Sequence, residues 1–313
     1  MTTKWNIPFV KLSNRFFMIS GVLMALILIF SFILGVDLAI EFRGGAIITY
    51  AFEGDLDRAA FESVAQQITD ATITVREVQS LVPGSAEVNE TMVITLPGTI
   101  SLTSEQIILL NEGLVEAFPE NNIRNFQTDN VDATMGAEFL AKSMTAIALA
   151  SVFMVIYVAF RFRKIGGMSA GVMAVVGLLH DIAIVYGAFL FFRFPISINF
   201  MAVVLTILGY SLNDTIIVYD RIRENRRLYG SKLTLEELVD RSTNQCLTRS
   251  IHTSITTILA MLVVAIVALI FNVQVIVTFA LPIIVGLISG TYSTLCIAGP
   301  LWVKWRNYRD AKA

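Results

Sequence analysis

The chain has 313 residues, of which 55% are hydrophobic and 15% are charged, and its formal net charge at pH 7 is −2. Its mean hydropathy of +0.70 and its shortage of charge exclude an ordinary soluble domain. The nearly neutral charge balance gives no basis for a nucleic-acid partner, and we expect none. The composition instead predicts an α-helical polytopic membrane protein surrounded by membrane lipid.

Several apolar runs are long enough to cross a bilayer, which takes about 20 residues of helix. Lys4, Lys11 and Arg15 precede the first run, which is longer than the apolar core of a signal peptide, so we expect an uncleaved anchor. The six predicted spans are residues 16–36, 139–160, 168–192, 196–219, 251–271 and 275–303.

Lys and Arg residues concentrate in alternate connections: before the first span, after the second, after the fourth and after the sixth. Positively charged loops stay in the cytoplasm, so both termini are expected there. The resulting plan is a cytoplasmic tail (1–15), a first span (16–36), an external domain (37–138), five further spans (139–303) with a cytoplasmic loop at 220–250, and a cytoplasmic tail (304–313).

The external segment 37–138 is large enough to be a small soluble domain. Apolar alternation and helical periodicity predict the order β-α-β-β-α-β, which is typical of a ferredoxin-like α+β fold. We expect Ser104 to cap the second helix. The predicted elements are strand 46–52, helix 57–69, strands 72–79 and 92–96, helix 104–118 and strand 123–128.

The external domain shows no catalytic pattern. It contains no His and no Cys, and its acidic residues are spread as on a solvated face. Calcium binding is the alternative for these acids, but no loop has the alternating ligand spacing of calcium sites. Cys246 and Cys296 lie outside the domain, and the chain has neither zinc-site spacing nor a phosphate-binding loop. We expect no metal, no cofactor and no enzymatic activity. The energy for any transport would then come from an ion gradient or from a partner protein.

The fourth span contains an ionisable residue, Asp214, in an otherwise apolar stretch. Thr206, Tyr210 and Asn213 share its helical face. A charged side chain in hydrocarbon costs at least a few kcal/mol, so Asp214 is a candidate functional residue whose face must meet other helices or water. The alternative is a polar cluster that only holds helices together.

Arg249 opens the fifth span at a depth similar to that of Asp214, and this predicts an ion pair. Parting the pair would change the proton affinity of the carboxylate, as an ion-coupled machine requires. The alternative for Arg249 is an anchor that reaches the headgroups. In the third span, Asp181 is a further candidate for the ion pathway, whereas His180 is more simply a hydrogen-bonded packing residue.

Small residues predict where helices approach closely and where the chain can bend. Gly167 and Gly171 open the third span, and Gly286 and Gly290 have the same spacing in the sixth, which lets helix backbones approach. In the loop 220–250, Thr234 and Glu237 form a capping box before an expected short amphipathic helix at the membrane surface or against a partner.

Glycines also flank the external domain. Gly44 and Gly45 lie on one side and Gly136 on the other, and these are the positions where hinges are available. We expect a domain that moves about them and holds or positions a chain.

Two motifs point to a known family. Residues 209–215 read Gly-Tyr-Ser-Leu-Asn-Asp-Thr and residues 220–225 read Asp-Arg-Ile-Arg-Glu-Asn. With residues 179–181 (Leu-His-Asp), residues 248–250 (Thr-Arg-Ser) and one large external loop after the first of six spans, the whole chain resembles the SecD/SecF family. The loop 38–45 departs from the family pattern, because Glu41 stands where Asp is usual and Arg43 replaces a small residue.

The resemblance implies a half-transporter of the resistance–nodulation–division type in the bacterial inner membrane, with a periplasmic domain. It implies an accessory role in protein export, with SecD, the SecYEG channel and a translocating preprotein as partners and H+ or Na+ as the coupling ion. The ion-pathway residues of the family map onto Asp214 and Arg249, and we include Asn213 and Asp181.

Three alternatives remain from the sequence. The chain could be half of a small-molecule exporter, although the external domain is small for that task. It could be an intramembrane aspartyl protease with Asp181 and Asp214 as its dyad, although the Gly-x-Gly-Asp motif of such enzymes is absent. It could also be a structural subunit without ion flux, in which Asp214 only holds helices together.

Overall fold

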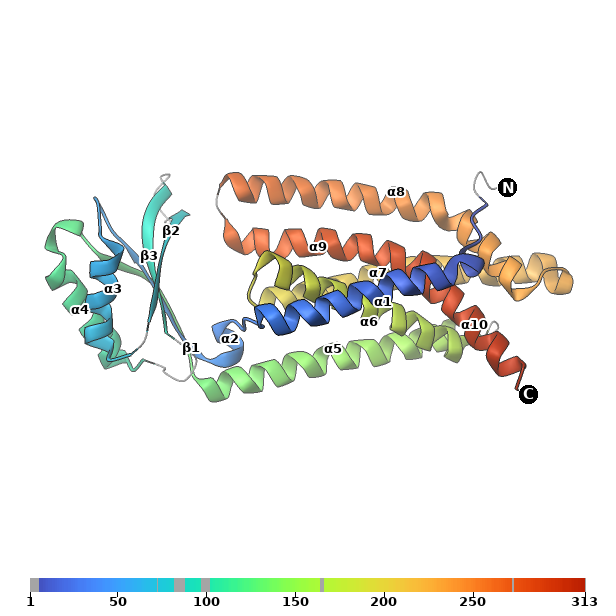
Figure 1. The fold of residues 1–313 in the computed structure, drawn as a ribbon, viewed down its shortest axis with the longest axis horizontal. Helices are drawn as coiled ribbons and strands as arrows, with labels where there is room; N and C mark the ends of the chain where they lie inside the picture. The colour runs from blue at the N-terminus through green and yellow to red at the C-terminus, as the bar shows by residue number, and fades with distance from the viewer. Residues whose placement is uncertain are drawn as a thin grey trace.

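The computed structural model describes residues 6–71, 73–81, 88–96, 102–163, 166–271 and 273–312. The molecule is elongated: a bundle of long helices carries a small α+β domain at one end, and both termini lie at the other end (Figure 1). Lys4 and Thr72, which belong to the predicted N-terminal tail and second strand, lie outside the described residues.

All six predicted spans are helical, so the polytopic α-helical fold is confirmed. Six helices among the described residues are long and apolar enough to cross a membrane. They are α1 (Phe9–Leu34), α5 (Ala133–Arg161), α6 (Gly167–Phe192), α7 (Ile198–Tyr229), α8 (Leu235–Ile270) and a final run of α9 (Gln274–Tyr292), a π-helix (Ser293–Ala298) and α10 (Gly299–Asp310).

Several helices start earlier than the apolar runs predict. Helix α1 begins at Phe9 rather than at residue 16, and α5 begins at Ala133 rather than at residue 139. For α5 the reason is a cap: the Asp132 side chain accepts from the amide of Thr134. A helix begins where its end is capped, and the apolar run begins only where lipid contact starts.

The predicted short amphipathic helix in the loop 220–250 is wrong. Thr234 and Glu237 do form the capping box, but the helix they start is α8, which continues without a break to Ile270. Helix α7 likewise extends to Tyr229. Residues 235–270 contain no Gly or Pro, so nothing in the sequence interrupts the helix between its cap and its membrane part.

Helices α6, α7 and α9 form the centre of the bundle. Between 39% and 50% of the residues in the most apolar stretch of these three spans are buried within the protein, against 6% for α1 and α5. Their core includes Phe189, Val203, Ile207 and Leu287. The outer helices therefore present most of their surface to lipid or to other proteins.

The α+β domain has the predicted order of elements. The elements are β1 (Gly45–Ala51), α3 (Arg58–Thr69), β2 (Thr74–Leu81), β3 (Val88–Leu96), α4 (Ser104–Ala117) and β4 (Arg124–Val131). The described strands form one antiparallel sheet in the order β2-β3-β1-β4, so β3 lies between the two strands that α3 connects, as in a split β-α-β unit. The cap of α4 is Thr103 and not Ser104: the Thr103 hydroxyl accepts from the amide of Gln106.

One face of the sheet is covered by α3 and α4, and the other is turned toward the helical bundle (Figure 1). Alternate residues of β1, namely Ala46, Ile48 and Tyr50, enter the core under the helices. The Tyr50 hydroxyl donates to Asn111 Oδ1 at 2.6 Å, and burial raises the pKa of this phenol.

The junction between domain and bundle is closely packed. The four-residue helix α2 (Ile40–Arg43) places Phe42 against Phe139, with 5.7 Å between the ring centroids. The Ala39 amide donates to the carbonyl of Ile196 at 3.0 Å. A Cβ on Gly136 would lie 2.8 Å from the amide nitrogen of Gly44. Two of the proposed hinge glycines therefore contact each other, and any swing of the domain must break this contact.

The residues that depart from the family pattern lie at this junction. Arg43, in α2, pairs with Asp37 at 3.6 Å. Glu41 has a buried carboxylate oxygen for which the described residues provide no hydrogen-bond partner.

Candidate ion site in the helical bundle

Asp214 is the central residue of the candidate site. It lies on α7 with only 4% of its surface exposed. The Ser250 hydroxyl of α8 donates to its Oδ1 at 2.7 Å. The other oxygen, Oδ2, is buried and has no hydrogen-bond partner among the described residues. A buried carboxylate oxygen without a donor is rare and needs a proton, a cation or water to satisfy it.

A cavity of about 280 Å³ lies beside Asp214, between α7 and α8. Its polar walls include Asn213, Arg249 and the hydroxyl of Tyr210, which is also buried without a partner among the described residues. The cavity is large enough for several water molecules. A half-satisfied carboxylate beside such a space can take up and release a proton or a small cation.

Arg249 does not form the predicted ion pair. Among the described residues no contact within 4.0 Å joins its guanidinium to Asp214, although both line the same cavity. The neighbouring Ser250 is the residue that reaches the carboxylate. Adjacent helical residues point about 100° apart, so only one of the two can face Asp214 directly.

The polar stripe on α7 is only partly covered. Asp214 is buried, but Asn213 and Thr206 are exposed, and the Thr206 hydroxyl turns back to the Ala202 carbonyl. On α8, Arg249, Thr253 and Thr256 are also exposed. These residues form an exposed polar strip on the surface of the bundle. Contact of this strip with lipid hydrocarbon would be energetically unfavourable, so we expect another protein surface or water to cover it.

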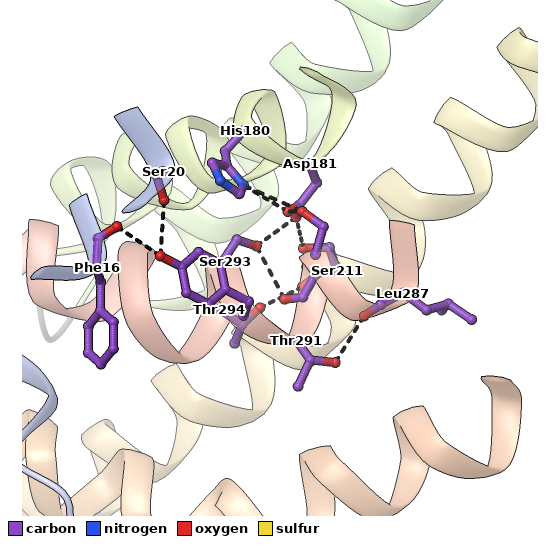
Figure 2. Close-up of polar contacts among 12 residues, drawn as sticks. Phe16, Ser20, His180, Asp181, Ser211, Leu287, Thr291, Ser293 and Thr294 are labelled. Carbon is purple, nitrogen blue, oxygen red and sulfur yellow. Dashed lines mark hydrogen bonds and ion pairs between the residues drawn. The ribbon is translucent and has the colours of Figure 1, made fainter. Parts of the chain in front are cut away.

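Asp181 occupies a different kind of site (Figure 2). It lies on α6 and is fully buried. Ser211 and Ser293 donate to its Oδ2 at 2.7 and 2.6 Å, Ser289 donates to Oδ1 at 2.6 Å, and His180 Nδ1 lies 3.3 Å from Oδ1. The three serines come from α7, α9 and the π-helix, so this carboxylate ties the central helices together.

His180 continues this cluster toward α1. Its ring lies against Tyr292, with 5.8 Å between the centroids, and the Tyr292 hydroxyl donates to the Phe16 carbonyl and contacts Ser20 (Figure 2). His180 therefore has the packing role expected from the sequence.

Close helix contacts allow the serines to reach Asp181. A Cβ on Gly286 would lie 2.6 Å from the side chain of Ile207, and one on Gly290 would lie 3.2 Å from Ser211 Cβ. A Cβ on Gly167 would collide with the Ala159 carbonyl of α5, and one on Gly171 would lie 3.1 Å from the carbonyl oxygen of Val155, one helical turn earlier on α5.

The structure does not bring the two aspartates into one site. Their hydrogen-bonding partners differ, and no hydrogen bond within the described part of the chain joins them. A protease dyad shares a proton between adjacent carboxyls, and this geometry gives that alternative no support.

Sequence reasoning missed the serines that bind both carboxylates. Ser250 was next to the chosen Arg249, and Ser289 and Ser293 occur four residues apart beside the glycine motif of α9. Serines at i and i+4 on a helix share a face, and this was the available signal for a polar contact with a neighbouring span.

Comparison with known proteins assigns the family. Residues 112–308 match the family described as Protein export membrane protein SecD/SecF, C-terminal. The chain belongs to the SecD/SecF family. Its relatives include the protein translocase subunit SecF of Sebaldella termitidis, which is 32% identical over 97% of this chain and 93% of the relative. SecF of Alicyclobacillus acidocaldarius is 31% identical over 97% of this chain and 94% of the relative.

Two crystal structures of SecDF resemble the fold. The translocon-associated SecDF of Thermus thermophilus has a TM-score of 0.75 and 29% identity over 98% of this chain. SecDF in a super-membrane-facing form has a TM-score of 0.67 and 30% identity over 100% of this chain. This chain spans 40% of each SecDF chain. With its apolar helices and these relatives, it is a multi-pass membrane protein.

Proposed function

We propose that the chain is an accessory subunit of the Sec preprotein translocase, which with SecD uses a proton or sodium motive force to promote protein export across the bacterial inner membrane. The names of its SecF relatives support the export role. One observation carries the ion coupling: Asp214 is buried, one of its oxygens has no partner among the described residues, and it borders a polar cavity.

The open polar strip supports a SecD-like partner. Asn213, Arg249 and Thr253 are exposed where the bundle would otherwise meet lipid. This chain spans 40% of each SecDF chain, so each SecDF chain has a further part that this chain lacks. A partner that corresponds to this further part would cover the polar strip. Asp214 and Arg249 would then lie between the two halves, and SecYEG and the preprotein would be contacted by the complex.

The distribution of positive charge supports cytoplasmic termini. The ends of α5 and α7 and the two chain termini lie at the end of the bundle away from the α+β domain (Figure 1). These connections carry most of the Lys and Arg outside the spans, and such segments stay in the cytoplasm. The α+β domain would then be periplasmic.

The decisive experiment replaces Asp214 by Asn, which keeps the shape and the hydrogen bond with Ser250 but removes the titratable charge. Preprotein export and co-purification of SecD are measured in the same strain. We expect export to be lost while the complex still assembles. Glu224→Gln, at an exposed position of the same helix, is the matched control and should export normally.

Two outcomes would contradict this proposal. Normal export by Asp214→Asn would favour the structural subunit without ion flux. Loss of SecD co-purification would mean that Asp214 serves assembly and not ion movement.

The α+β domain is proposed to position the emerging chain by moving about Gly44, Gly45 and Gly136. Arg76 on the sheet and Gln274 at the start of α9 line one cavity between domain and bundle. Cysteines at these two positions, joined by a cleavable bis-maleimide linker, should block export, and cleavage should restore it. Each single cysteine, treated alike, is the control. Full export with complete crosslinking would leave the domain as a static binding surface.

A further inference from the structure

A third cavity, of about 860 Å³, lies at the end of the bundle that carries the chain termini. It is formed where α5 ends, α6 begins and α10 passes. Phe160, Met168 and Val172 line it and are 68%, 66% and 43% exposed. The cavity is thus a mostly apolar groove open to the side of the bundle, where lipid surrounds the protein.

Positive charge borders the groove. Arg163 and Arg309 line it together with Trp305, whose side chain is 47% exposed. Arg309 pairs with Asp310 at 3.2 Å. Arg163 contacts the ring of Phe160 and has no acidic partner among the described residues.

A further arginine, Arg306, lies directly behind Gly166, which lines the groove. A Cβ on Gly166 would lie 2.7 Å from Arg306 Nη1, so the absence of a side chain at Gly166 makes room for the guanidinium. Arg306 Nε is buried without a hydrogen-bond partner among the described residues. Asp310 is the one carboxylate of this group and pairs with Arg306 at 4.0 Å and with Arg309 at 3.2 Å. Three guanidinium groups and one carboxylate leave the groove with an excess of positive charge.

We propose that this groove binds an anionic phospholipid, with the phosphate between Arg163 and Arg309 and an acyl chain along Phe160, Met168 and Val172. Arginines at a membrane interface attract anionic headgroups, and an exposed tryptophan is typical of that depth. A soluble anion such as inorganic phosphate would satisfy the arginines but would leave the apolar wall uncovered. The inference goes beyond the proposed export role and does not depend on it.

The test uses the full chain in detergent and native mass spectrometry. Phosphatidylglycerol, phosphatidylcholine with the same acyl chains, and inorganic phosphate are titrated separately. We expect phosphatidylglycerol to bind best. The double variant Arg163→Gln/Arg309→Gln should bind it about thirtyfold more weakly, because each arginine near an anionic lipid contributes about fivefold. Arg226→Gln/Arg227→Gln, exposed at the same end of the bundle, is the matched control and should bind as the parent does.

A second variant tests the apolar wall. Val172→Trp should fill the acyl slot and weaken phosphatidylglycerol binding without changing the arginines. The proposal is overturned if phosphatidylcholine or phosphate binds equally well, or if the arginine variant keeps the parent affinity. It is also overturned if that variant loses a protein partner while its lipid preference stays the same, because the groove would then be a protein interface.

Discussion

Two buried aspartates on neighbouring central helices have opposite environments. Asp181 has three serine donors and a histidine around it, with every contact inside the bundle. Asp214 has one serine donor and borders a polar cavity. A carboxylate whose hydrogen bonds are filled is held in place, whereas one with an unfilled oxygen can still exchange a ligand. The difference supports our proposal that Asp214 is the ion site, while Asp181 joins three central segments by hydrogen bonds.

Removing each carboxylate should give the largest contrast. Asp181→Ala removes the shortest hydrogen bond of three buried hydroxyls, and losing such a bond or leaving its donor unsatisfied costs about 1–3 kcal/mol each. We expect it to lower the free energy of unfolding by about 3 kcal/mol or more, and Asp214→Ala by clearly less. Unfolding in mixed micelles measures both. Equal losses would show that the two sites do not differ in this way.

Double-mutant cycles should separate the two neighbours of Asp214. The Asp214–Ser250 hydrogen bond is direct and buried, so its coupling energy should be about 1 kcal/mol or more. The coupling between Asp214 and Arg249 should be below about 1 kcal/mol, because they do not form a direct pair in this structure. The cycles use Asp214→Ala, which removes both interactions, with Ser250→Ala or Arg249→Gln and the same unfolding assay. A larger coupling for Arg249 would mean that the directly paired state dominates.

Chemical labelling should show which site water can reach. In a background lacking Cys246 and Cys296, Asn213→Cys beside the cavity should react readily with a water-soluble maleimide. Ser289→Cys, beside Asp181, should react slowly, because it is buried. Similar rates at the two positions would remove the distinction between an open and a closed site.

Asp132 provides an exposed reference carboxylate, with the smallest expected effect. Hydrogen bonds from the hydroxyl and then the amide of Thr134 lower the pKa of its carboxyl below the usual value. The stabilisation is therefore complete above the unfolded pKa, about 3.9, and is lost as the pH falls through the folded pKa. Hydrogen-exchange protection of the first turn of α5 should fall at low pH in the parent and change little in Asp132→Asn. Parallel pH profiles would contradict this.

The helices and strands could be predicted from the sequence more accurately than the contacts between them. Span number, the β-α-β-β-α-β order and the contact of Asp214 with another helix followed from apolar length, periodicity and the cost of a buried charge. These signals are local, and local patterns can be counted along one chain. The start of α1 and the continuity of α8 were predicted wrongly because hydrophobicity alone does not set helix length. Asp240 of α8 accepts from the amide of Val10 in the first turn of α1, and no helix breaker interrupts α8.

Contacts between helices depend on rotation about each helix axis, which one sequence does not fix. The similar membrane depth of Arg249 and Asp214 correctly predicted that the two residues lie near each other. Adjacent residues of a helix point about 100° apart, and it is Ser250 rather than Arg249 that makes the hydrogen bond. The same limit hid Ser289 and Ser293. Their partner Asp181 lies more than 100 positions away in the chain.

The π-helix at Ser293–Ala298 has a consequence for sequence divergence. A π segment holds one more residue than the α-helical turn it replaces, while the helices on either side keep their facing. Deleting one residue within it would restore a regular helix and leave Trp302 buried against α6. Deleting one residue from α9 instead would turn everything downstream by about 100° and carry Trp302 away from Ser169, to which it donates at 3.0 Å. Length variation in this last span should therefore be tolerated in the part of the π-helix that follows Ser293 and Thr294, whose side chains bind Asp181 and Thr215, and selected against on either side.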